Sequence, residues 1–68
     1  MSEYSKLVSA ETHAHTIEIV EKSTGKRGVA NTCADGVAVF YGSDDGSDDK
    51  TISPEEFNRM FIITDILG

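Results

Sequence analysis

The chain has 68 residues, of which 38% are hydrophobic and 26% charged, and its formal net charge is −6. A chain of this length forms one domain with a small core, which leaves little room for the deep pocket of an enzyme. Twelve acidic side chains outnumber six basic ones, and the resulting negative charge repels phosphate groups. We therefore expect neither direct nucleic-acid binding nor attachment to an anionic membrane.

Residues 1–11 are polar and rich in serine, and we expect a flexible N-terminal arm. Within it, Tyr4, Leu7 and Val8 have the i, i+3, i+4 spacing of a single helical turn, which would let the arm dock weakly. The remaining residues, 12–66, are expected to form one small β domain.

Alternating polar and apolar residues over 12–22 predict a half-buried strand. Ile17 and Ile19 lie on one face of it, because side chains two positions apart in a strand point the same way. A turn at 23–26 then leads into a return strand over 27–32.

Asp35 and Gly36 form the strongest turn signal, and we expect them to be the central pair of a type I′ hairpin. The strand that follows, 37–41, is rich in β-branched and aromatic residues. Residues 42–50, GSDDGSDDK, contain four aspartates and no apolar side chain, which predicts a solvated loop.

The last quarter of the chain predicts a short strand at 51–52, a short helix and a final strand at 61–66. Ser53 is a suitable helix cap, Pro54 suits the first helical position, and Glu56 stands where a capping box has an acid. We therefore expect helix only at about residues 54–60, apart from the N-terminal arm.

The fold class that follows is mainly β: about five short antiparallel strands, forming a small barrel or a curled sheet, with one short helical turn. The alternative is an α+β fold in which a helix covers a three- to four-stranded sheet. The expected core consists of eight apolar side chains: Ile17, Ile19, Val29, Val37, Val39, Phe57, Phe61 and Ile63.

Five strands with a helical turn before the fifth resemble the small SH3-like β-barrels, including those of phage or prophage interaction proteins. The resemblance is one of architecture, covers residues 12–66 and involves no sequence motif. It implies a module that binds other proteins.

Residues 45–57, DGSDDKTISPEEF, resemble the calcium loop and exit helix of an EF-hand. The ligands that this resemblance implies are Asp45, Ser47, Asp49, Thr51, Ser53 and Glu56. However, Lys50 stands where the loop requires glycine, and a strand rather than a helix is expected before it. A solvated loop followed by a capped helix explains the same residues, so we expect no cofactor and no metal.

Other candidate sites are incomplete. His13 and His15 would share one face of the first strand, but two imidazoles alone do not make a zinc site. Cys33, the single cysteine, has no base placed beside it. One cysteine and the lack of a signal peptide predict a cytoplasmic protein.

Phe40 and Tyr41 are adjacent in a strand, so one of these aromatic rings must point away from the core. We expect the partner-binding residues to be Asp44, Asp45, Asp48, Asp49, Phe40 and Tyr41. The predicted function is a non-enzymatic protein–protein interaction module, or a small inhibitor or adaptor, that binds a basic protein surface. A homodimer would stabilise a domain with so small a core. The alternatives are an acidic nucleic-acid mimic that inhibits a host DNA-binding protein or nuclease, and a weak calcium-binding module.

Overall fold

The computed structural model describes residues 2–42 and 49–68. In chain order its elements are α1 (Glu3–Ala10), β1 (Thr16–Glu21), β2 (Arg27–Cys33), β3 (Gly36–Phe40), β4 (Lys50–Ile52), α2 (Pro54–Met60) and β5 (Phe61–Leu67).

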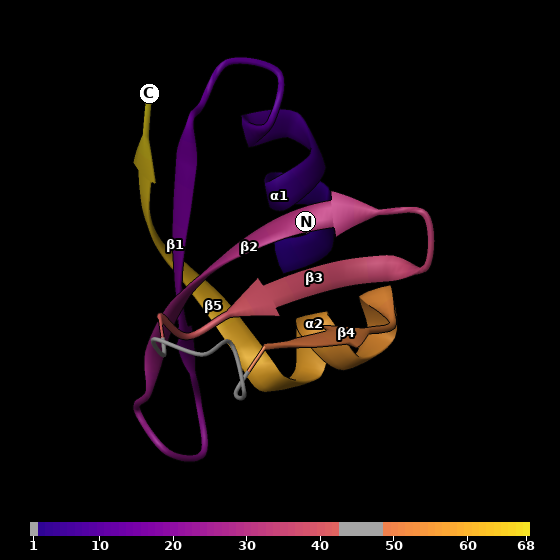
Figure 1. The fold of residues 1–68 in the computed structure, drawn as a ribbon, viewed down its shortest axis with the longest axis vertical. Helices are drawn as coiled ribbons and strands as arrows, with labels where there is room; N and C mark the ends of the chain where they lie inside the picture. Colours follow the sequence, from indigo (N-terminus) through magenta and orange to yellow (C-terminus); the bar gives the residue numbers. More distant parts are fainter. Residues whose placement is uncertain (1, 43–48) are drawn as a thin grey trace.

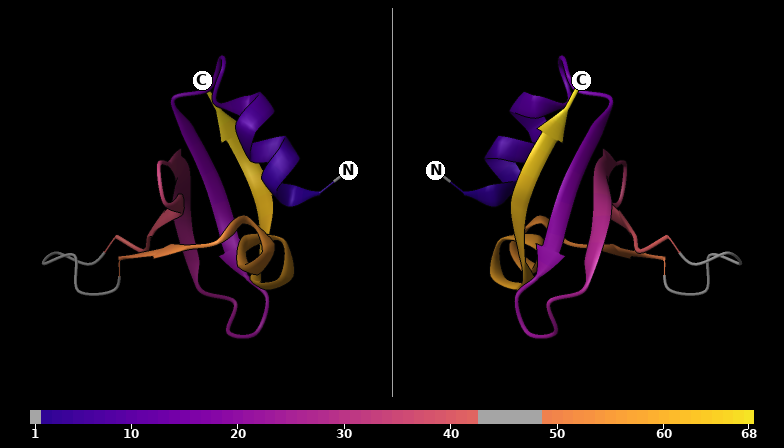
Figure 2. Two further views of the ribbon diagram at one scale, coloured as in Figure 1. Left: turned by 90° about the vertical axis from the view of Figure 1, so that its right-hand side faces the viewer. Right: turned by 90° about the vertical axis from the view of Figure 1, so that its left-hand side faces the viewer.

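The five strands form one antiparallel sheet in the order β4-β3-β2-β1-β5, which confirms the expected mainly β fold. The sheet is strongly curled: β1 and β5 cross β3 and β4 at a steep angle (Figure 1). It is open rather than closed into a barrel, because β4 and β5 are its two edges. Both helices lie on the same side of the sheet (Figure 2).

The N-terminal segment differs from the expected flexible arm. Residues Glu3–Ala10 form α1, which Ser2 caps by accepting a hydrogen bond from the Ser5 N–H. Leu7 is fully buried, and the Tyr4 N–H donates a 2.7 Å hydrogen bond to Oδ1 of Asn58 in α2. The apolar residues of the predicted single turn therefore belong to a longer helix, and its buried side chains are part of the core.

The turn between β2 and β3 is not the expected type I′ hairpin. Cys33 and Gly36 are cross-strand partners, so the two turn residues are Ala34 and Asp35. A type I′ turn needs positive φ at both of them, whereas among the described residues only glycines have positive φ. Gly36 begins β3 with φ 136°, and a Cβ there would collide with the carbonyl oxygen of Ile52 in β4.

The second helix begins as expected. The Ser53 hydroxyl accepts a 3.2 Å hydrogen bond from the Glu56 N–H, and Pro54 occupies the first turn. Phe57 of this helix stacks on Phe61 at the start of β5, with 5.7 Å between ring centroids. Capping thus fixes where α2 starts, and aromatic packing fixes it against the sheet.

Six of the eight predicted core residues are buried. Among the described residues, the buried core is Leu7, Ala10, Ile17, Ile19, Ala30, Val37, Val39, Ile52, Phe57 and Phe61. Val29 is a wrong prediction. Ala30 is paired with the buried Val39, so Val29, one position earlier, points to the opposite face. Ile63 is half-buried and packs against the core from β5.

Candidate functional site

The side of the sheet turned away from α1 and α2 is called the outer face here. Along β1, β2 and β3 its side chains alternate with those of the core. Four apolar side chains lie on it as two cross-strand pairs, Val29 with Phe40 and Val20 with Ile62. Phe40 is 38% exposed and Ile62 41% exposed, so neither is covered by another element that the structure describes.

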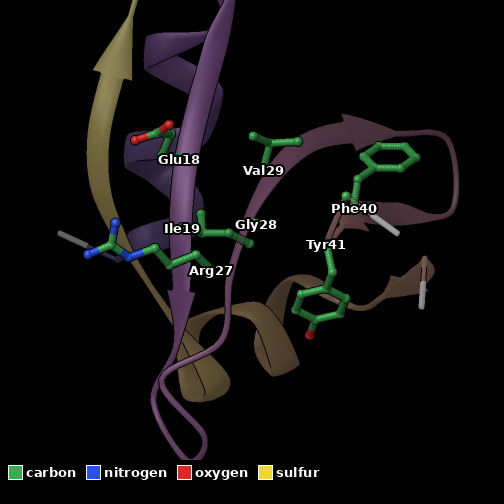
Figure 3. Close-up of a pocket in the computed structure, with 8 residues that line it drawn as sticks. Glu18, Ile19, Arg27, Gly28, Val29, Phe40 and Tyr41 are labelled. Carbon is green, nitrogen blue, oxygen red and sulfur yellow. The ribbon is translucent and has the colours of Figure 1, made fainter. Parts of the chain in front are cut away.

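An open pocket of about 270 Å³ lies at this face, beside the last cross-strand pair of β2 and β3, Val29 with Phe40. Figure 3 shows its lining, which comes from Glu18 and Ile19 of β1, from Arg27, Gly28 and Val29 of β2, and from Phe40, Tyr41 and Gly42. A Cβ on Gly28 would lie 2.5 Å from the carbonyl oxygen of Phe40. Glycine therefore allows the two strands to approach closely beneath the pocket.

The pocket wall carries both charge and apolar surface. Glu18 and Arg27 are exposed, and both extend past the same side of β1 (Figure 3). Between described residues, the one ion pair within 4.0 Å joins Lys6 to Glu3 on α1. A ligand at the pocket would thus meet a carboxylate, a guanidinium and the apolar side chains of Val29 and Phe40.

The two adjacent aromatics, as expected, lie on opposite faces. Tyr41 turns toward the helix side, where its ring lies 6.3 Å from that of Phe61 and its hydroxyl donates a 3.2 Å hydrogen bond to Oε1 of Glu21. The ammonium of Lys26 lies 4.6 Å from the centre of the same ring. The structure therefore presents the Phe40 ring on the outer face and keeps Tyr41 among intramolecular contacts.

The acidic loop falls mostly outside the described residues. The loop residues that are not described include the expected partner-binding residues Asp44, Asp45 and Asp48, and the expected calcium ligand Ser47. Asp49 is described, and it is exposed immediately before β4.

The described residues of the EF-hand-like segment take part in strand pairing and helix capping. Thr51 is paired with Ala38 in the sheet, and the Ser53 hydroxyl caps α2 by accepting from the Glu56 N–H. A strand, β3, precedes the loop, as expected. Within 2–42 and 49–68, no three His, Cys, Asp or Glu side chains form a group that could hold a metal ion.

The remaining sequence candidates are separate exposed side chains. His13 and His15 lie before β1 rather than on it, which corrects the expected common strand face, and the His15 N–H donates to the carbonyl of Leu67. Cys33 is exposed at the end of β2.

Sequence reasoning did not select Glu18, Arg27, Val29 or Ile62 as site residues. In the alternation along 12–22, Glu18 and Val20 fall on the face opposite the predicted core residues Ile17 and Ile19. The sequence does not reveal the pairing of β1, β2 and β3, which brings Val29 and Phe40 beside them.

Among the described helices, none is both long and apolar enough to cross a bilayer. Comparison of the chain with models of protein families, with curated proteins and with solved structures gives no match.

Proposed function

We propose that this chain is a non-enzymatic interaction module whose outer face binds a protein with a basic surface. The observation that carries the proposal is the apolar centre of that face. Phe40 and Ile62 are each about two-fifths exposed, beside the half-buried Val29 and Val20. When one face of an antiparallel sheet packs on the core, the solvent-exposed face normally carries polar side chains at such positions.

The chemistry of the face supports binding rather than catalysis. Its pocket offers an aromatic ring next to a valine, which is the kind of apolar anchor that dominates the binding energy of protein interfaces. The titratable side chains that line it are Glu18, Arg27 and Tyr41. None of the three is a serine, threonine or cysteine, and the hydroxyl of Tyr41 is held by its hydrogen bond to Glu21.

The charge of the chain selects the partner. A net charge of −6 attracts a basic surface and raises the rate of encounter with it. Gly42 lines the pocket and is followed in the sequence by four aspartates within residues 44–49. An apolar contact on a chain of this acidity fits a partner with an apolar centre and a basic rim.

The test is capture of proteins from a lysate of the source cells by three immobilised chains: wild type, Phe40→Ala and Val8→Ala. Val8 is the matched control, because it is 44% exposed but belongs to α1. We expect one protein that wild type and the Val8 variant retain alike, that Phe40→Ala binds about tenfold more weakly, and that salt releases. Equal retention by Phe40→Ala would contradict the proposal. Release of the captured protein by free DNA would instead favour the nucleic-acid mimic.

A further inference from the structure

Two acidic residues are paired across neighbouring strands of the sheet. Glu18 of β1 and Asp65 of β5 are direct cross-strand partners, and both are exposed. Like charges in this position destabilise a sheet. The register of the two strands shifts between Glu18 and Ile19, so the pair lies next to an irregularity in the ladder. The pairing therefore places two negative charges on neighbouring strands, and the core needs neither of them.

The compensation available within the described chain is partial. Arg27 lines the same pocket as Glu18, but no ion pair within 4.0 Å joins it to Glu18 or Asp65. Asp65 uses one oxygen, Oδ1, to accept a 2.9 Å hydrogen bond from the Ile66 N–H. Lys6 of α1 lines a second pocket with Asp65, but its ion pair is with Glu3. Neither Glu18 nor Asp65 therefore has an ion-pair partner within 4.0 Å among the described residues.

The pair belongs to a row of side chains that crosses four strands. In the register of the sheet, Asp65 is opposite Glu18, Glu18 is opposite Val29, and Val29 is opposite Phe40. The row therefore reads acid, acid, apolar, apolar from β5 to β3. Neighbouring strands are about 4.8 Å apart, so along the surface of the sheet the backbone at Val29 lies about 7 Å and that at Phe40 about 12 Å from the midpoint between the two acids.

These spacings match one side of an extended peptide. In such a peptide, residues i, i+2 and i+4 point the same way and lie about 6.6 and 13 Å from the first. A basic side chain at i would then reach the two carboxylates while apolar side chains at i+2 and i+4 contact Val29 and Phe40.

We propose that the outer face binds an extended segment of its partner in which a lysine or arginine is followed by apolar residues two and four positions later. The basic group lies between Glu18 and Asp65 and relieves their repulsion. The second apolar side chain enters the pocket at Phe40. This inference rests on the proposed function, because it specifies which part of a basic partner the same face recognises.

The experiment is an NMR titration of the ¹⁵N-labelled chain with the peptide acetyl-Arg-Thr-Leu-Thr-Leu-amide. We expect saturable shifts of the amides in the acid–apolar row of β5, β1, β2 and β3. A peptide with glutamate in place of arginine, and one with the same residues in the order Arg-Leu-Thr-Thr-Leu, test charge and spacing and should bind more weakly. Shifts centred on Asp49, or equal binding of all three peptides, would overturn the inference.

Two double variants separate the charge effect from a general loss of acidity. The combination Glu18→Gln with Asp65→Asn should weaken binding of the arginine peptide about tenfold, since a charge pair at an interface contributes this order of free energy. The matched control, Asp35→Asn with Glu55→Gln, removes the same charge at exposed positions outside the pocket and should bind like wild type.

The variants also distinguish failure of this inference from failure of the proposed function. If Phe40→Ala weakens binding but the Glu18/Asp65 variant does not, the basic anchor is wrong and the apolar surface stands. If neither variant weakens binding, this inference and the proposed function are both wrong. Without any peptide, Glu18→Gln should raise the Tm of the free chain by a few degrees. An unchanged Tm would contradict the repulsion on which the basic anchor rests.

Discussion

Replacing Leu7 by alanine tests whether α1 is part of the folded domain. Leu7 is fully buried, so the change removes apolar contacts and leaves a cavity, at a cost of about 2.7–5.0 kcal/mol. A domain of this length has a free energy of unfolding of roughly 3–10 kcal/mol. One truncation in the N-terminal helix therefore removes a large part of the total stability.

Urea unfolding followed by far-UV circular dichroism measures this effect directly. The Tm should also fall by at least about 10 °C, at about 4–8 °C for each kcal/mol. Val8→Ala is the control, because Val8 is the next residue on the same helix and is 44% exposed. It should change stability by less than about 0.5 kcal/mol. If Leu7→Ala were as mild as Val8→Ala, residues 1–11 would be an arm and the packing described for α1 would be wrong.

Three further substitutions test local features of the fold. Gly36→Ala should destabilise the chain by about 1–3 kcal/mol, because its φ of 136° and the nearby Ile52 carbonyl leave no place for a Cβ. Ser53→Ala should cost about 1 kcal/mol by removing the cap of α2. Glu3→Gln should destabilise at neutral pH and have a smaller effect in acid. Burial would raise the pKa of Glu3, but the hydrogen bond from the Ile63 N–H and the nearby Lys6 hold it below 4.5.

The sign of the Glu3 effect follows from that lowered pKa. Its carboxylate stabilises the fold fully above the unfolded value near 4.5, and this contribution is lost as the pH falls through the lower folded value. The difference between wild type and Glu3→Gln in urea midpoint should therefore shrink below pH 4.5. A difference that is constant with pH would contradict this. A neutral Gly36→Ala or Ser53→Ala would refute, respectively, the close approach of β3 to β4 and the capping of α2.

Local features of the chain could be predicted because their causes lie within a few residues. The serine, proline and glutamate at 53–56 start a helix through contacts made inside its own first turn. The alternation around Ile17 and Ile19 indicates a strand with one buried face, and the structure shows both side chains buried. In the predicted strand over 37–41, adjacent side chains also alternate between the two faces, so Phe40 and Tyr41 must point in opposite directions.

Features that depend on distant partners could not be predicted in this way. Leu7 is buried because α1 packs on the sheet and on α2, and its own sequence contains only one turn of apolar spacing. Val29 and Ala30 are both apolar, so composition alone does not indicate which of them faces the core. The register with β3 decides it, since Ala30 is opposite the buried Val39.

The candidate site shows the same division. The exposed phenylalanine and the acidic character of the chain follow from the order of its residues. The row of Asp65, Glu18, Val29 and Phe40 joins residues up to 47 positions apart, and only the pairing of four strands brings them together. Side-chain direction within a strand is a local property of backbone geometry, whereas the neighbour across the sheet is set by which strands pair and in which register.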